Sequence, residues 1–299
     1  QAHGSVVVRI EDTMILATIV SAHEPRENAA FFPLSVDYQE KYAAVGRIPG
    51  NFFRRETRLN DYEILISRLV DRAIRPLFPD GYMHDTQVIL TLHSSDQRNL
   101  PDAYAALAAS AAIVVSDINW NGPISEVRVA KINGEYVVNP EKEALEGAEL
   151  EIIVAATMDN VMMVEGEANE CQEADLIEAI KVGHEAIKVQ CKAQLELAQL
   201  VGEAATVKRV LPEAPSSDEA LALVKEVTTD KIIAVAHGAM DKVTRKDALK
   251  AIKTELKEAA AEKGDEWMAE HGSFISAYFD KHKKATLREV VMSEKVRLD

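Results

Sequence analysis

The chain has 299 residues, of which 47% are hydrophobic and 28% charged, and its formal net charge at pH 7 is -15. At about 150 residues per domain this length suggests two domains, and no run reaches the roughly 18 apolar residues of a membrane span. Cys171 and Cys191 are the only cysteines, too few for a disulfide framework and without the paired spacing of a zinc site.

The start of the chain reads as part of a folded domain. Its apolar residues are interrupted by Arg9, Glu11 and Asp12, which a signal peptide with a clean apolar core would not contain. We therefore expect a cytoplasmic protein without a membrane partner.

The first two thirds of the chain alternate runs typical of strands with runs typical of helices. Runs rich in Val, Ile and Thr favour strands, Asn133-Gly134 favours a type I′ hairpin turn, and Pro76 would end a helix. One helix is so rich in alanine that we expect it to pack close against a sheet. In chain order the sequence predicts strands at 5–10 and 13–20, a helix at 61–75, a strand at 86–93, the alanine-rich helix at 101–115, a hairpin at 127–132 and 136–138, a second hairpin at 150–155 and 161–164, and a long helix at 173–200.

Only helices are expected in the last third, after a short connector that contains two prolines. Ser216 with Glu219 fits a capping box, and Thr244 with Asp247 offers a weaker start signal of the same kind. The predicted fold class is therefore α+β, a βα domain followed by a small all-α domain. The expected boundaries are 1–203 for the first domain, 204–215 for a linker, 216–292 for the helical domain with a third helical stretch from about 273 to 292, and 293–299 for the start of a linker to a further domain.

The charge is unevenly distributed along the chain. Residues 47–75 contain seven arginines, four acids and no lysine, a net of +3, whereas residues 141–203 contain fifteen acids and four lysines, a net of -11. Screening limits the reach of each charge to about 8–10 Å at ordinary salt, so a basic patch on an acidic body can still hold a nucleic acid. The acidic remainder would discourage nonspecific binding elsewhere.

A loop with two aromatic and two basic residues follows the turn signal Pro49-Gly50-Asn51. Phenylalanine rings stack on bases and guanidinium groups pair with phosphate, so Phe52, Phe53, Arg54 and Arg55 form a plausible binder of a single strand. The alternative is that the rings return to the core and the arginines form surface salt bridges. The residues alone slightly favour that second interpretation.

The helix after this loop carries Arg68, Arg72 and Arg75 along one face, spaced four and three residues apart. Asp71 can pair with Arg75 at i, i+4, which favours a structural role for Arg75. Arg68 and Arg72 have no such helical partner and are the better candidates for binding phosphate.

Other chemical motifs are absent from the sequence. It contains neither a Walker-type glycine loop nor a Gly-x-Gly-x-x-Gly fingerprint, which argues against a nucleotide-hydrolysing motor or a dinucleotide enzyme. The eight histidines form no His-Glu-x-x-His pattern, and no acid pair stands out as a metal site, so no metal is expected on this chain.

Several long segments resemble one known family. They are FFPLSVDYQE at 31–40, AVGRIPGNFFRRE at 44–56, SRLVDRAIRPLFPDGY at 67–82 and PDAYAALAASAA at 101–112, with shorter matches at 121–123 and 163–165. They resemble the first RNase PH-like domain of polynucleotide phosphorylase, and the helical tail resembles the all-helical domain that follows it in that family.

The resemblance implies an RNA-binding, non-catalytic half of a phosphate-dependent 3′-to-5′ exoribonuclease that degrades single-stranded RNA to nucleoside diphosphates. The family forms homotrimers around a channel, uses magnesium or manganese with inorganic phosphate as co-substrate, and can join RNA-degradation assemblies. By residue, the resemblance places Phe52, Phe53, Arg54 and Arg55 at a channel constriction and Arg68 and Arg72 near the RNA. It places the phosphate and metal ligands on a second RNase PH-like domain beyond residue 299, so no catalytic residue is assigned here and the chain alone is expected to be inactive.

Two other functions stay open at this point. One is a non-catalytic RNA-binding ring or scaffold subunit. The more distant one is a small-molecule enzyme whose arginine helix holds a phosphorylated metabolite.

Overall fold

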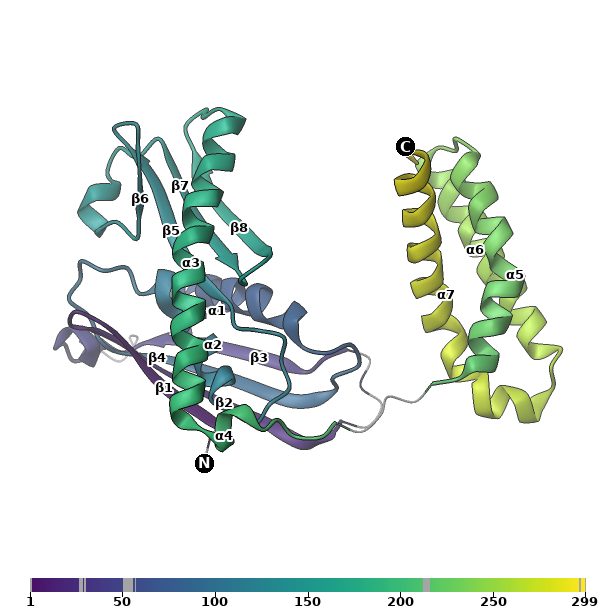
Figure 1. The fold of residues 1–299 in the computed structure, drawn as a ribbon, viewed down its shortest axis with the longest axis horizontal. Helices are drawn as coiled ribbons and strands as arrows, with labels where there is room; N and C mark the ends of the chain where they lie inside the picture. The colour runs from purple at the N-terminus through teal and green to yellow at the C-terminus, as the bar shows by residue number, and fades with distance from the viewer. Residues whose placement is uncertain are drawn as a thin grey trace. The chain divides into compact units, whose positions relative to one another are not determined.

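The computed structural model describes residues 2–26, 29, 31–50, 56, 58–211, 216–295 and 297–298. The chain divides into two compact units, Gln1–Pro212 and Glu213–Asp299. The first combines strands and helices and the second contains helices throughout its described part (Figure 1), so the predicted α+β class is confirmed. None of the helices in the described part combines the length and apolar character that a membrane crossing requires.

The first sheet holds four strands in the order β1-β2-β4-β3. β1 and β2 are antiparallel, as are β2 and β4, whereas β3 runs parallel to β4. Alternate residues of β2, from Thr13 to Ser21, are buried, which is the period of a strand with one face on the core. The strands are β1 (Gly4–Ile10), β2 (Thr13–Pro25), β3 (Leu34–Glu40) and β4 (His84–Ser94); the sequence predicted all but β3.

The second sheet is antiparallel throughout, in the order β6-β5-β7-β8. Asn133 and Gly134 take φ values of 52° and 81°, so the predicted hairpin turn with two left-handed residues is confirmed. The strands are β5 (Ser125–Ile132), β6 (Glu135–Val138), β7 (Leu150–Ala156) and β8 (Val161–Ala168).

Three helices pack on the two sheets (Figure 1). The alanine-rich α2 (Asp102–Val114) contacts β1, β2 and β4 of the first sheet and β5 of the second. Its close approach is visible at Gly4 of β1, where an added Cβ would collide with the backbone carbonyl of Ala112. The expected close packing of this helix is therefore confirmed. α1 (Asp61–Ile74) packs on β3 and α2, and α3 (Glu173–Val201) covers β5, β6 and β7.

The segment after α3 also packs on the first unit. A short helix, α4 (Glu203–Thr206), is followed by Lys208, whose Nζ donates to the carbonyl oxygens of Val114 and Ser116. Arg209 forms an ion pair with Asp117 at 2.5 Å. The predicted linker thus begins with residues that are fixed on the first unit. Three short 3-10 helices complete this unit: η1 (Tyr42–Val45), η2 (Arg75–Leu77) and η3 (Lys142–Leu145).

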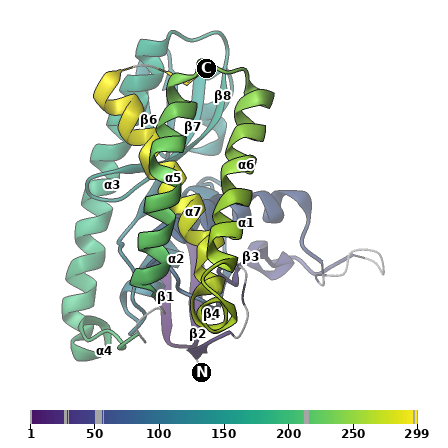
Figure 2. The ribbon, with the colours of Figure 1, turned by 90° about the vertical axis from the view of Figure 1, so that its right-hand side faces the viewer.

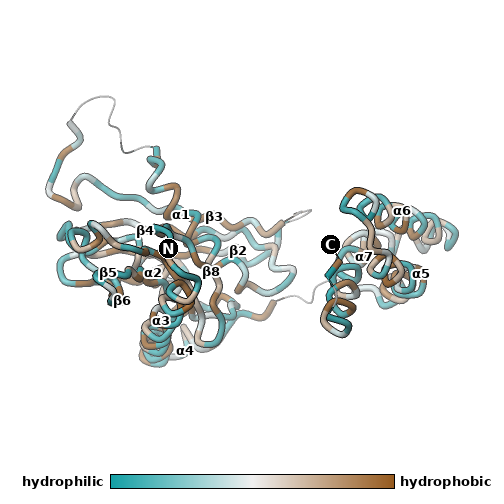
Figure 3. Tube along the Cα trace, turned by 90° about the horizontal axis from the view of Figure 1, so that it is seen from above, coloured by the Kyte–Doolittle hydropathy of each residue, from teal (hydrophilic) through white to brown (hydrophobic). Residues whose placement is uncertain are grey.

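The second unit is a three-helix bundle of α5 (Asp218–His237), α6 (Lys242–Ala261) and α7 (Asp265–Glu294), in which each helix contacts the other two (Figure 2). Each helix alternates hydrophobic and hydrophilic stretches (Figure 3), as expected for helices with one face on a core. That core includes Val224, Ile232, Leu256 and Phe279.

The predicted starts of these helices are wrong by one to eight residues. Ser217, not Ser216, caps α5, because its hydroxyl accepts from the backbone N–H of Ala220 at 3.0 Å. Asp241, not Thr244, caps α6. α7 begins at Asp265 rather than near residue 273; Trp267, which packs on the core of the bundle, stands in its first two turns among several charged residues.

Candidate nucleic-acid interface

The start of α1 is fixed to the end of β3 by a capping box. The side chain of Asn60 accepts from the backbone N–H of Glu63 at 2.9 Å, and Glu63 accepts from the backbone N–H of Asn60 at 2.7 Å. The other carboxylate oxygen of Glu63 accepts from the backbone N–H of Glu40 at 2.7 Å. Ser67, one turn later, accepts from the backbone N–H of Tyr38 at 2.9 Å. These bonds set the orientation of α1, and with it the direction of its arginines.

A groove of about 420 Å³ runs along the exposed side of α1 and is lined by Arg68, Arg72 and Arg75. Its lining carries three arginines and two aspartates. The structure therefore brings together the three arginines that the sequence placed on one face. The remaining lining residues are Val36, Asp37, Leu59, Ile64, Ser67 and Asp71.

Arg75 has a structural role, as its spacing from Asp71 predicted. Its guanidinium forms two bonds to the carboxylate of Asp71, at 2.9 and 2.6 Å. It also donates to the carbonyl oxygens of Phe32 at 2.9 Å and Leu34 at 3.1 Å. Arg75 thus ties α1 to the entry of β3, and four of its five N–H donors are occupied.

Arg72 and Arg68 differ in their partners. Arg72 forms an ion pair with Glu165 of β8, a partner distant in sequence. Both side chains are about half exposed, at 50% and 53%. Arg68 is exposed and forms no ion pair with any residue that the structure describes. An anion in the groove would therefore find the guanidinium of Arg68 without an ion-pair partner among the described residues, whereas it would share the guanidinium of Arg72 with the exposed carboxylate of Glu165.

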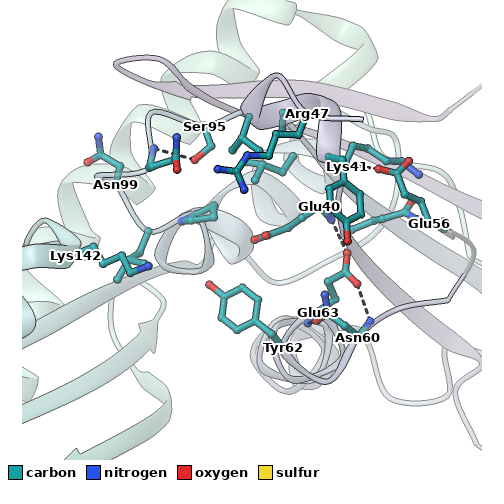
Figure 4. A pocket seen from close by; sticks show the side chains of 18 of the residues that line it. Glu40, Lys41, Arg47, Glu56, Asn60, Tyr62, Glu63, Ser95, Asn99 and Lys142 are labelled. Atoms are coloured by element: carbon teal, nitrogen blue, oxygen red, sulfur yellow. Dashed lines mark hydrogen bonds between the residues drawn. The ribbon is translucent and has the colours of Figure 1, made fainter. Parts of the chain in front are cut away.

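A larger cleft of about 670 Å³ opens on the other side of the α1 start (Figure 4). Figure 4 shows the guanidinium of Arg47 and the hydroxyl of Tyr62 pointing into the same space. Arg47, Arg58 and Lys142 are exposed cations of this lining. Arg47 and Arg58 belong to the arginine-rich segment of the sequence, but no pattern there separated them from the other arginines.

The acids of the cleft are largely engaged by the protein itself. Glu56 accepts from the backbone N–H of Tyr42 at 2.6 Å, and Glu63 is held in the capping box. Burial raises the pKa of Glu40, although a hydrogen bond from the Tyr38 hydroxyl opposes the shift. The cations are therefore the groups of this cleft that are most available to a ligand.

Four of the six candidate residues, Phe52, Phe53, Arg54 and Arg55, lie outside the described residues. Gly50 and Glu56, on either side of them, are described, and Glu56 lines the larger cleft. The carbonyl oxygen of Glu56 accepts from the side-chain amide of Gln39 at 3.0 Å. Glu56, the first described residue after these four, therefore lies at this cleft.

Within the described part of the chain, no group of three His, Cys, Asp or Glu side chains is placed to hold a metal ion. The acids of the two hollows accept hydrogen bonds from protein groups instead: backbone N–H groups, an arginine, the Tyr38 hydroxyl and the Gln87 amide. These residues do not form a site for the divalent metal that the resemblance implies.

Three family descriptions match the chain. "3′ exoribonuclease family, domain 1" matches residues 1–119 and "3′ exoribonuclease family, domain 2" matches residues 122–186. "Polyribonucleotide nucleotidyltransferase, RNA binding domain" matches residues 219–299. The first two fall on the mixed unit and the third on the helical unit.

Curated proteins named polyribonucleotide nucleotidyltransferase are similar over the whole chain. The protein from Bacteroides fragilis is 49% identical over 300 residues, covering 100% of this chain and 42% of the relative. The protein from Parabacteroides distasonis is 49% identical over 299 residues, covering 100% of this chain and 40% of the relative. The chain thus spans about two fifths of the length of these relatives.

Among solved structures, rice (Oryza sativa) Rrp46 is similar with a TM-score of 0.54 and 16% identity, over 66% of this chain and 89% of that one. At this identity the likeness concerns the fold, and it supports the predicted RNase PH-like fold of the mixed unit. Together with the family matches on both units and the relatives that align over the full chain, it shows that the chain belongs to the polyribonucleotide nucleotidyltransferase family.

Proposed function

We propose that this chain supplies the RNA-guiding part of a phosphate-dependent 3′-to-5′ exoribonuclease that degrades single-stranded RNA to nucleoside diphosphates. The observation that carries the proposal is the groove on α1, in which Arg68 is exposed without an ion pair among the described residues and Arg72 lies one turn away. Guanidinium groups bind phosphate oxygens through paired, charge-assisted hydrogen bonds. Two of them one turn apart can hold successive phosphates of one strand.

The role of these arginines is positioning. A phosphorolytic step requires the terminal phosphodiester to lie in line with the attacking phosphate, so a fixed backbone upstream of the bond favours the reaction. We assign the inorganic phosphate and the magnesium or manganese ion to a second RNase PH-like domain outside this chain. When bound there, the metal would neutralise charge that develops on the phosphate oxygens. The working assembly would be a cytoplasmic homotrimer, with other RNA-degradation proteins as partners.

The loop residues Phe52, Phe53, Arg54 and Arg55 complete the proposed RNA path. Stacking on the two rings and pairing of the two arginines with phosphate would be tolerant of base sequence. Replacing both Arg54 and Arg55 by alanine should weaken binding to RNA of any sequence. The slope of the logarithm of the binding constant against the logarithm of the salt concentration should become shallower by roughly one to two units. An unchanged slope would show that Arg54 and Arg55 do not contact the RNA backbone.

Phosphorolysis tests the proposal directly. A protein of the relatives' length should release nucleoside diphosphates from single-stranded RNA when phosphate and magnesium are present, and residues 1–299 alone should not. In the longer protein, Arg68→Ala and Arg72→Ala should each raise KM for RNA on the order of tenfold, since each removes a charge-assisted contact. Arg9→Ala, which removes an exposed arginine near the end of β1, is the matched control. Equal KM values for all three variants would contradict the assigned role, and a longer protein that binds RNA without degrading it would favour a scaffold.

A further inference from the structure

The lysines of α6 gather on one side of the helix. Five of them are spaced by four, four, three and four residues, and at 3.6 residues per turn this places them within an arc of about 80°. The acids of the same helix, among them Asp247, Glu255 and Glu258, lie on a different arc. Leu249, Ile252 and Leu256 face the core of the bundle. We call the lysine arc the lysine face; on α6 it consists of Lys242, Lys246, Lys250, Lys253 and Lys257.

Four of these lysines have no acidic partner within the described part of the chain. Lys242, Lys246, Lys250 and Lys257 are exposed and form no ion pair with a described residue. Like charges three or four residues apart repel each other and destabilise a helix. The same helix carries acids that could have been interleaved with the lysines, yet the two signs are separated. That separation indicates that the lysine face has an external anionic partner.

α7 extends the lysine face. Lys253 of α6 and Lys283 of α7 both lie over the ring of Phe279, at 5.6 and 5.3 Å from its centroid. Both also bind Asp280, at 2.8 and 2.7 Å, and the bond from Lys253 contributes most to lowering the pKa of this carboxyl. The lysine face with Lys283 therefore contains six lysines and one aspartate that pairs with two of them. Its balance of charge is strongly positive, although residues 213–299 as a whole carry seventeen acids against fifteen bases.

The helical unit matches a family description that reads RNA binding domain, which names no surface. We propose that the lysine face is that surface and that it binds the phosphate backbone of a single nucleic-acid strand, as a second contact besides the arginine groove of α1. The proposal rests on the proposed function only in taking RNA as the natural strand. From Lys242 to Lys257 the face extends about 22 Å along the helix, at about 1.5 Å per residue. That length corresponds to roughly six phosphates at the spacing of about 3.4 Å in a stacked strand.

The chemistry of the lysine face predicts that it does not discriminate between bases or between ribose and deoxyribose. Phe279 is buried at 1% exposure beneath the two lysines, so it offers no surface on which a base could stack. Ammonium groups bind phosphate as point charges and carry no information about base or sugar. The face should therefore bind RNA and single-stranded DNA about equally and without base preference.

Salt-dependent binding by the full chain tests the lysine face. The test variant is Lys246→Gln with Lys250→Gln and Lys257→Gln. The control is Lys225→Gln with Lys231→Gln and Lys263→Gln, which removes the same charge from the same helical unit. Binding to oligoadenylate is measured over a range of salt concentrations. The logarithmic salt slope of the test variant should fall by about two units, at about 0.7 per phosphate contact, and that of the control by much less.

Two further measurements test whether positive charge alone accounts for binding by the lysine face. Arginine at the same three test positions should retain the slope, and oligodeoxyadenylate should show the same loss as oligoadenylate. Removal of like-charge repulsion should leave thermal stability unchanged or higher, so weaker binding could not be ascribed to unfolding. Equal slopes for the test and control variants would overturn the proposal and point instead to another anionic partner, such as an acidic protein surface. Because the readout is binding, an absence of phosphorolysis would leave this result unaffected.

Discussion

Arg72 of α1 and Glu165 of β8 form an ion pair between elements that are 93 residues apart in sequence. The pair joins the helix that carries the arginine groove to the edge strand of the second sheet. Both side chains remain about half exposed, so solvent screens their attraction, and such a pair contributes about 0–1 kcal/mol. A phosphate can therefore compete with Glu165 for Arg72 at little cost in stability.

Glu165→Gln should strengthen RNA binding. The substitution frees Arg72 and removes a negative charge from the edge of the groove, and we expect an increase of a few-fold in affinity at low salt with a change in unfolding free energy of less than about 1 kcal/mol. Glu167→Gln, two residues further along the exposed end of β8, removes the same charge without an arginine partner. Equal gains from the two substitutions would show that only overall charge matters.

Alanine substitutions of Arg75 and Arg68 should have different effects, because Arg75 stabilises the fold and Arg68 is proposed to bind RNA. Arg75→Ala removes bonds to Asp71, Phe32 and Leu34, so the unfolding free energy in urea should fall by about 1–3 kcal/mol. Arg68→Ala removes an exposed side chain without an ion pair among the described residues and should change stability by less than about 0.5 kcal/mol. RNA affinity should fall more in the Arg68 variant than in the Arg75 variant, provided that the Arg75 variant is measured under conditions where it is folded. A large loss of stability in the Arg68 variant would contradict its proposed availability.

Local signals in the sequence were sufficient for much of the fold. Asn133-Gly134 fixed a hairpin because two successive left-handed residues are unfavourable for most other pairs. Asp71 four residues before Arg75 was enough to predict that this arginine is structural. Both inferences depend on neighbours within one turn, where spacing along the chain determines distance.

Tertiary relationships were not visible in the sequence. β3 was missed although Leu34, Val36 and Tyr38 alternate with polar residues, because Glu40 and the shortness of the run weaken that signal; the parallel pairing with β4 is what the sequence could not show. Glu165 was part of a recognised motif, but nothing local connected it with Arg72. The wrong start of α7 has a related cause, since only the packing of Trp267 on the core of the bundle shows that these charged turns belong to the helix.

Gly4→Ala should test the close packing of α2 on the first sheet. A methyl group at this position would meet the carbonyl group of Ala112, and neither backbone can move without disturbing the core. We expect a loss of at least about 1–3 kcal/mol in unfolding free energy, the range for overpacking in a dense interior. Ser5→Ala, at the next and exposed position of β1, should be nearly neutral. A Gly4 variant as stable as the Ser5 variant would show that α2 and β1 can separate without cost.

The carboxyl group of Glu126 should make stability depend on pH. Glu126 on β5 is fully buried, and neither of its carboxylate oxygens has a hydrogen-bond partner among the described residues. Burial, reinforced by the charge of Asp102 on α2, raises the pKa of this carboxyl to about 8, against the opposing effect of Arg128. Arg128 is itself paired with Asp102 and with Glu151 of β7, so its charge is already shared.

The stability contributed by Glu126 should fall as pH rises, because the folded protein binds a proton that the unfolded chain has released. Between a pKa of about 4.5 in the unfolded chain and about 8 in the folded one, the folded protein holds the extra proton. The contribution of Glu126 to stability is therefore fully present below the lower value and is lost as pH rises through the higher one. Glu126→Gln cannot ionise, so its unfolding free energy relative to the parent chain should increase steadily from about pH 5 to about pH 8. Urea unfolding across that range measures the difference, with Glu135→Gln on the exposed side of β6 as the control. A difference that stays constant with pH would mean that Glu126 is already ionised in the folded protein at pH 5.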